Sequence, residues 1–205
     1  MKKFLIILSA LLLVGCGGNK TKQPQDTEKT KEQTDLSDDK KDDVTTKESD
    51  TPSGEWESSD MGDNRVVAKK DINETYQTGA FKITVNAVQI MEIKPENEMR
   101  SFIDKDIATV ITINLTAENT SDEFLNIYPD QSEITTNTKE QITPELLLTD
   151  DVGGEFKGKV IKEGNIIYVS DSKPEDIKNI KMYIEGPTDS EFSTVGADLT
   201  INMDL

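Results

Sequence analysis

The stretch that decides the fold class reads Ile107-Ala-Thr-Val-Ile-Thr-Ile-Asn-Leu-Thr-Ala117. Apolar and polar residues alternate along most of its length. The apolar side consists of Ile107, Ile111, Ile113, Leu115 and Ala117, and the polar side of Thr112, Asn114 and Thr116. Because successive side chains of a strand point to opposite faces of its sheet, this period of two predicts a β-strand with one buried face.

Similar runs recur through the rest of the chain. Residues 81–87 alternate in the same way, and the apolar face then moves to Val88 and Ile90, which predicts a β-bulge near Ala87. Further strands are predicted at residues 124–128, 133–136, 155–161, 165–170, 180–184 and 197–205. We expect the runs 155–161 and 165–170 to pair around Lys162-Glu163-Gly164, and the C-terminal run to lie inside a sheet.

Helical character is limited to one turn within residues 171–179, where acidic residues come first and a lysine comes late. About seven to nine strands separated by turn residues are typical of an antiparallel sandwich. The sequence therefore predicts an all-β fold, a β-sandwich domain over residues 61–205.

Composition and charge restrict the function. The chain has 205 residues and carries 23 Lys and Arg against 40 Asp and Glu, a net charge of −17. Nucleic acid is excluded as a partner, because phosphate contacts need clustered basic residues. A single cysteine rules out an internal disulfide, and the absence of histidine removes the usual general base and metal ligand. We therefore expect no enzymatic activity, no cofactor and no metal.

The N-terminus has the layout of a secretory signal peptide. Lys2 and Lys3 precede an apolar run at residues 4–14, which is shorter than the ~20 residues that a membrane-spanning helix needs. The following Leu13-Val14-Gly15-Cys16 resembles the lipobox of bacterial lipoproteins. This resemblance implies that residues 1–15 are removed and that Cys16 carries a diacylglyceryl lipid. It also implies that the lipid holds the protein on the extracytoplasmic face of the cell membrane.

The segment 16–60 is predicted to be a disordered acidic tether. Residues 17–60 contain 7 Lys and 13 Asp and Glu with few apolar residues. Such a segment buries too little apolar surface to offset the entropy that ordering would cost. Trp56 is its one aromatic residue, and the sequence leaves open whether this side chain packs on the domain or is exposed.

The domain also resembles a known group of proteins. The resemblance lies in Gly79-Ala-Phe-Lys-Ile-Thr-Val-Asn-Ala-Val88, in the long strand and Asn-containing turn of residues 108–124, and in the strand pair at 158–169. These stretches resemble the Ig-like domains of uncharacterised Gram-positive lipoproteins, which are similar in fold to a mycobacterial secreted immunoprotective antigen. The resemblance implies an Ig-like sandwich over residues 73–205 and brings no catalytic or ligand-binding residues.

Two sets of side chains are candidates for a site. Asp150-Asp151-Val-Gly-Gly-Glu155 has the oxygen ligands of a hard cation such as Ca²⁺ but not the spacing of a calcium loop, so we interpret it as a solvated turn. A second set has aromatic side chains suited to a recognition groove, although strand aromatics belong to the core more often. It consists of Phe102, Phe124, Tyr128 and Tyr168.

These features favour a non-enzymatic binding or interaction domain displayed on the membrane. Its partner would be an envelope protein or an extracellular ligand. Two alternatives stay open: an accessory or structural subunit of a cell-envelope complex, and a cell-wall hydrolase that uses paired Asp and Glu residues.

Overall fold

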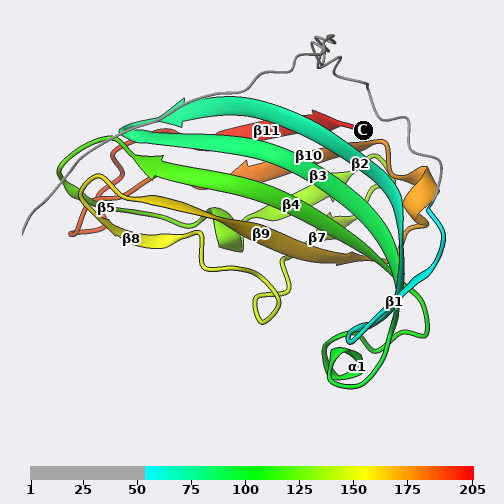
Figure 1. Cartoon of the computed structure of the whole chain (residues 1–205). Helices are drawn as coiled ribbons and strands as arrows, with labels where there is room; N and C mark the ends of the chain where they lie inside the picture. Colours follow the sequence, from blue (N-terminus) through cyan, green and yellow to red (C-terminus); the bar gives the residue numbers. More distant parts are fainter. Residues whose placement is uncertain (1–53) are drawn as a thin grey trace, which may run out of the picture. The chain divides into compact units, whose positions relative to one another are not determined.

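Residues 108–119 form a central strand of a five-stranded antiparallel sheet in the computed structural model, which describes residues 54–205 (Figure 1). The strands in chain order are β1 (Glu57–Ser59), β2 (Gly62–Thr78), β3 (Phe81–Pro95), β4 (Ala108–Asn119), β5 (Phe124–Ile127), β6 (Glu133–Thr136), β7 (Gln141–Ile142), β8 (Gly154–Lys157), β9 (Ile161–Ser170), β10 (Asn179–Ile184) and β11 (Leu199–Asp204). Helical structure is limited to α1 (Met99–Phe102) and two 3-10 turns, η1 (Pro129–Gln131) and η2 (Pro174–Asp176).

The strands form two facing sheets and a small ribbon. The larger sheet has the order β1-β2-β3-β4-β9, the second sheet has the order β11-β10-β6-β7, and β5 pairs with β8. Side chains from all three share one hydrophobic core, which includes Ile113 of β4, Phe156 of β8 and Met182 of β10. All of these pairs are antiparallel. The predicted all-β fold of antiparallel sheets is therefore confirmed.

The alternation has the predicted result within β4, whereas Ile107, predicted on the same apolar face, lies before the strand and is 52% exposed. Ile111, Ile113 and Leu115 are fully buried in the shared core, whereas Thr112 and Asn114 between them are only half-buried. The bulge is confirmed as well, since the pairing of β3 with β4 shifts register between Val85 and Ala87. Asn86 is the extra residue at this shift.

The long strand β2 was not predicted. It lies near the edge of the larger sheet, where β1 pairs only with its first residues, Gly62–Asn64. Only Gly62 and Thr78, at its two ends, are buried. The strand therefore lacks the alternation of apolar and polar residues from which a strand can be predicted. β1 itself begins at Glu57, inside the segment 16–60 that the sequence assigned to the tether. The rest of that tether before residue 54, and the signal peptide 1–15, lie outside the described residues.

One predicted pairing is wrong, and the expected pairing of the C-terminal strand within a sheet is found at the edge of that sheet. The runs 155–161 and 165–170 do not pair with each other, because β8 pairs with β5 and β9 pairs with β4. The C-terminal strand β11 lies at the edge of its sheet and pairs only with β10. The single predicted helical turn within 171–179 is present as η2, whereas α1 carried no periodic signal long enough to predict it.

A second, smaller hydrophobic cluster covers one end of the outer face of the larger sheet, the face turned away from the shared core. Val110 and Ile93 of the sheet pack there against Ile103, which follows α1, and Leu148 of the connection between β7 and β8. The same connection runs along the free edge of β9, where the Glu145 N–H donates to the Ile167 carbonyl at 2.8 Å. The edge of β9 is thereby occupied, as a long exposed edge strand requires.

Candidate functional site

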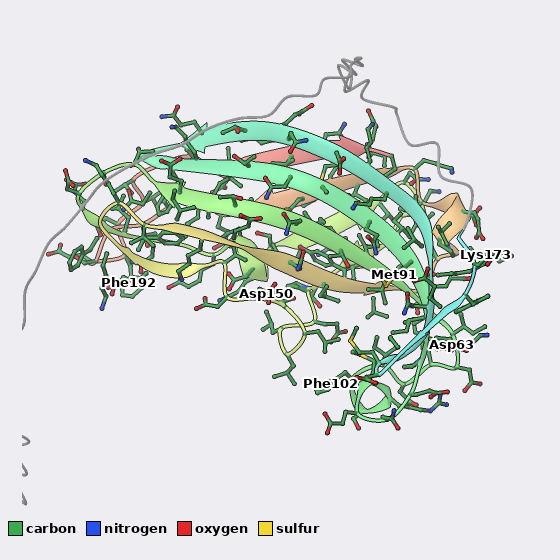
Figure 2. All side chains as sticks on the ribbon, in the orientation of Figure 1. Asp63, Met91, Phe102, Asp150, Lys173 and Phe192 are labelled. Atoms are coloured by element: carbon green, nitrogen blue, oxygen red, sulfur yellow. The ribbon has the colours of Figure 1, made fainter. Side chains whose placement is uncertain are left out.

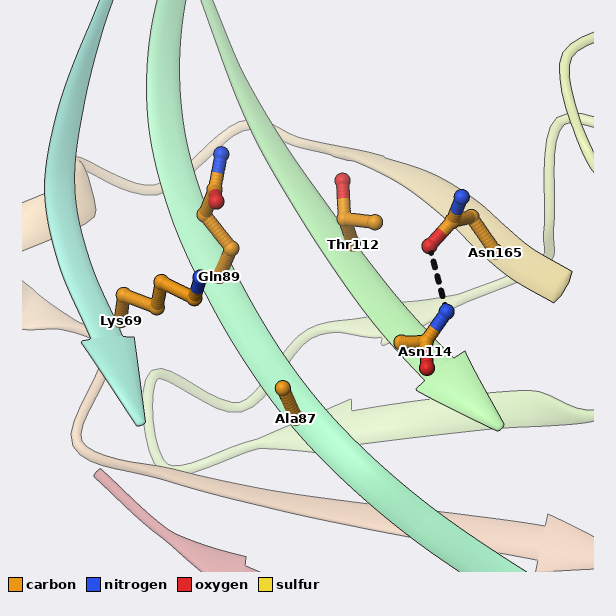
Figure 3. A pocket seen from close by; sticks show the side chains of 6 residues that line it. All are labelled: Lys69, Ala87, Gln89, Thr112, Asn114 and Asn165. Carbon is orange, nitrogen blue, oxygen red and sulfur yellow. Dashed lines mark hydrogen bonds between the residues drawn. The ribbon is translucent and has the colours of Figure 1, made fainter. Parts of the chain in front are cut away.

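The outer face of the larger sheet is open and polar beyond the second cluster. A groove of about 300 Å³ crosses β2, β3, β4 and β9 there (Figure 3). Its lining comes from Lys69, Ala87, Gln89, Thr112, Asn114 and Asn165. Thr112 and Asn114 belong to the polar side of the strand predicted from residues 107–117, so the sequence located this part of the face.

A row of carboxamide side chains runs across one side of the groove. The Asn86 Nδ2 donates to Asn114 Oδ1 at 2.8 Å and to Thr116 Oγ1 at 2.9 Å. The Asn114 Nδ2 donates in turn to Asn165 Oδ1 at 3.0 Å, the bond drawn in Figure 3. Asn86 extends the row because it is the extra residue of the β3 bulge.

The direction of this row follows from the backbone. The Asn114 Nδ2 also donates to the Gly164 carbonyl at 3.4 Å, and a carbonyl oxygen only accepts. Asn114 must therefore turn its Nδ2 toward β9, which makes Asn86 the donor and Asn165 the acceptor. Within residues 54–205 the Asn165 Nδ2 has no acceptor, so its two N–H donors, at an exposed position, can bond to water or to a ligand.

The remaining polar side chains of the groove also have no partner within the described part of the chain. Among the described residues, no side-chain hydrogen bond or ion pair engages Lys69, Gln89 or Thr112. Of the described residues in the lining, Lys69 alone is charged. The groove thus offers donors and acceptors for hydrogen bonds together with a single positive charge, and it is suited to holding a polar ligand.

The four aromatic candidates do not form a common groove. Tyr168 is fully buried, and its hydroxyl donates to the Ser132 carbonyl at 2.9 Å. Burial, with the nearby Asp130 charge, raises the pKa of Tyr168 above its ordinary value. The expectation of core positions is confirmed for Tyr168 and wrong for the other three, which are exposed on α1, at the start of β5 and before η1. These three are Phe102, Phe124 and Tyr128 (Phe102 is labelled in Figure 2).

The Trp56 ring contacts two basic side chains of the sheet and is 37% exposed. The Lys94 ammonium lies 4.0 Å from the centre of its ring, and the Arg65 guanidinium lies 5.4 Å from it. These cation–π contacts hold the first described residues against β2 and β3. Of the two possibilities that the sequence left open, each holds in part, since the ring touches the domain and is also exposed.

The acidic turn residues are engaged separately. Asp150 Oδ2 accepts the backbone N–H of Asn165 at 2.8 Å, Asp151 lies 3.5 Å from the Lys162 ammonium, and Glu155 pairs with Lys157. Residues 54–205 contain no group of three or more Asp, Glu, Cys or His side chains placed to hold a metal ion. Asp150 therefore has a local role in joining the β7–β8 connection to β9.

Cys16, the predicted site of lipid attachment, lies outside the described residues. Within residues 54–205, no helix has the length and apolar character needed to cross a membrane. The sequence did not single out Lys69, Gln89 and Asn165 of the groove lining, nor Asn86, which belongs to the amide row beside it. Lys69 belongs to the unpredicted strand β2, and Asn86 reaches the row only through the bulge.

Comparison with known proteins identifies relatives of this chain. No protein-family model matches the chain. A Listeria monocytogenes protein of unknown function shares the fold, with a TM-score of 0.54 and 14% identity over 70% of this chain and 88% of that one. The uncharacterized protein YdhF of Bacillus subtilis is 25% identical over 188 residues, covering 82% of this chain and 79% of YdhF.

The SPβ prophage-derived uncharacterized lipoprotein YonS of B. subtilis is 32% identical over 149 residues. The match covers 71% of this chain and 68% of YonS. With this identity over more than two thirds of both proteins, the chain belongs to the family of the lipoprotein YonS.

Proposed function

We propose that this protein is anchored to the outer face of the cell membrane by a lipid on Cys16 and presents its β-sandwich as a non-enzymatic, Ig-like binding domain. The lipobox residues 13–16 and the membership of a lipoprotein family support the anchor. A diacylglyceryl group supplies two chains, each contributing about 0.8 kcal/mol per buried methylene, which is enough for stable attachment. The net charge of −17 makes attachment through a basic patch unfavourable.

Substitution of Cys16, the single cysteine of the sequence, tests the lipid anchor. Cys16→Ala is expected to move the protein from the membrane fraction to the medium, or to leave it as the unprocessed precursor, because no acceptor for the lipid remains. Intact-mass spectrometry of the membrane-extracted wild type should give a chain that begins at Cys16 and carries a diacylglyceryl group. Lys20→Ala, outside the lipobox, serves as the control. Membrane retention of Cys16→Ala equal to that of Lys20→Ala would refute the lipid anchor.

The observation that carries the binding function is the groove with unpaired donors on the outer sheet face. Carboxamide and hydroxyl side chains pair well with ligand hydroxyls, and Lys69 suits a carboxylate or phosphate on the same ligand. The amide row is held by its own hydrogen bonds, so it is already ordered before a ligand arrives. We infer that the groove binds a hydroxyl-rich ligand with a negative charge, such as an acidic saccharide.

The double variant Lys69→Gln/Thr112→Val tests this groove. It removes the charge and one hydroxyl while it keeps the side chains close in size. With a carboxylated oligosaccharide as the probe, we expect at least a tenfold loss of affinity by titration calorimetry, since each lost pairing costs about 1–3 kcal/mol. A neutral oligosaccharide of the same length should bind the wild type more weakly.

The matched control is Lys181→Gln/Thr200→Val, which makes the same two changes at exposed positions of β10 and β11 in the other sheet. The control should bind the carboxylated probe like the wild type. Equal losses in both double variants, or wild-type affinity in the groove variant, would contradict binding at the groove.

A further inference from the structure

A tight hairpin of residues 187–195 projects from the end of the sandwich opposite α1, with Phe192 at its tip (Figure 2). Thr188 and Thr194 form its bridge, and the Asp189 N–H donates to the Ser193 carbonyl at 3.0 Å. The Asp189 Oδ1 accepts the N–H groups of Glu191 and Ser193, both at 2.9 Å. Asp189 therefore fixes the turn from inside.

The hairpin is also tied to the rest of the domain. Asn126 of β5 and Thr188 exchange backbone hydrogen bonds of 2.8 and 2.9 Å, and the Asn126 Nδ2 donates to the Asp189 carbonyl at 3.1 Å. The Val195 N–H donates to the Pro187 carbonyl at 2.8 Å. The tip is thus presented on a rigid base, which lowers the entropy that a contact there would cost.

Phenylalanine is an unfavourable residue for the backbone conformation and the exposure found at position 192. Its φ is +61°, the left-handed region, and 75% of its surface is exposed. The corresponding position of three-residue hairpin loops is normally glycine, because a side chain there strains the backbone. With three quarters of its surface exposed, the side chain buries little apolar area against the fold, while the backbone is strained. Such violations are expected where a residue serves binding.

The surroundings of Phe192 indicate what it can contact. Phe124 is a second exposed aromatic residue and lies on the same side of β5 as Asn126, which holds the hairpin. The lysines at this end are already paired, Lys157 with Glu155 and Lys159 with Asp122, each at 3.2 Å. Carboxylates without such partners among the described residues remain on the same loops, at Glu123 and Glu191.

We propose that this hairpin is a docking site for a protein that has an apolar pocket rimmed by Lys and Arg side chains, with Phe192 as the side chain that enters the pocket. An aromatic anchor in a desolvated pocket is the usual centre of a protein interface. The acidic surroundings favour a basic rim. They oppose both a second copy of this acidic chain and an anionic membrane, because like charges would meet.

The key variant is Phe192→Gly in the full chain. If Phe192 serves docking and not the fold, glycine relieves the strained φ and the melting temperature should rise by about 2–4 °C. A fall in the melting temperature would show that the ring supports the fold, and would overturn the proposal. Tyr183→Ser, at another exposed aromatic residue on β10, is the control and should melt close to the wild type.

Docking itself is tested with p-benzoylphenylalanine in place of Ser190, which leaves the neighbouring carboxylates intact. Irradiation of living cells should give one adduct that is lost in Phe192→Gly and kept in Tyr183→Ser. The adduct must map to an apolar pocket with basic neighbours, and the purified partner should bind Phe192→Gly at least tenfold more weakly than the wild type. No adduct, an adduct that survives Phe192→Gly, or an adduct with lipid or with a second copy would each overturn the proposal.

Discussion

Replacing Phe156 with alanine is expected to lower the free energy of unfolding by about 3–5 kcal/mol. Phe156 is fully buried, and its ring meets that of Phe81 edge-on, with 5.0 Å between centroids and planes at 84°. It also fixes the β5–β8 ribbon, whose strands pair over only four residues each, onto the shared core. Urea denaturation of the mature chain measures the loss.

The same ribbon supplies the control. Phe124 lies on β5 opposite Lys157 and is 55% exposed, so Phe124→Ala should cost less than about 0.5 kcal/mol. Because small domains have only about 5–15 kcal/mol of total stability, Phe156→Ala should also shift the urea midpoint visibly. Similar losses in both variants would contradict the placement of Phe156 in the core.

These two phenylalanines also illustrate how much of the fold can be predicted from the sequence. Alternation identifies which face of a strand is buried, and this was enough for β3, β4, β6 and β10. It carries no information on which strands are neighbours, since any strand with a suitable apolar face fits the same core. The pairing of β8 with β5 could therefore not be predicted.

The wrong hairpin between β8 and β9 has a specific cause. The sequence suggests Gly164 as a turn residue, whereas it lies within β9. A Cβ at this position would lie 2.5 Å from the Asp150 Cβ and 2.8 Å from Val152 Cγ2. Glycine is needed there because the β7–β8 connection approaches the strand closely. Close approach between distant segments leaves no local signal that separates it from a turn.

The groove on the outer sheet face could be predicted only in part, for similar reasons. The polar side of β4, with Thr112 and Asn114, follows from the alternation, and the bulge near Ala87 was recognised in the sequence. That the bulge would turn Asn86 onto Asn114 depends on the register of β3 against β4. Lys69 depends on β2, whose place beside β3 is set by backbone pairing and leaves no pattern of buried side chains. The site therefore appears only once the sheet is assembled.

Variants in the groove and variants in the hairpin should have independent effects on binding. The groove lies on the outer face of the larger sheet, and the hairpin is tied to β5 in the small ribbon. Lys69→Gln/Thr112→Val should leave the adduct at the hairpin intact, and Phe192→Gly should leave saccharide affinity unchanged. An accessory role in an envelope complex would depend on the hairpin, whereas ligand capture would depend on the groove.

Tyr168→Phe is expected to cost about 1–3 kcal/mol of stability, although it removes only one oxygen atom. The Tyr168 hydroxyl donates to the Ser132 carbonyl at 2.9 Å, and both residues are buried. Phenylalanine keeps the ring and so avoids a large cavity, but it leaves that carbonyl without its donor and away from water. The bond also joins β9 of the larger sheet to the residue before β6 of the other sheet, so its loss loosens the contact between them.

Urea denaturation again measures the effect, with Tyr183→Phe as the matched control. The Tyr183 hydroxyl lies 3.2 Å from Thr135 Oγ1 at an exposed position, where water replaces the lost partner, so less than about 0.5 kcal/mol is expected. Because burial raises the pKa of Tyr168, its hydroxyl keeps the proton to higher pH than an exposed phenol does. The stability difference between the wild type and Tyr168→Phe should therefore be constant from neutral pH up to about pH 10, the ordinary pKa of tyrosine. A difference that disappears within that range would mean that the hydroxyl is in contact with water and that the two sheets are joined in another way.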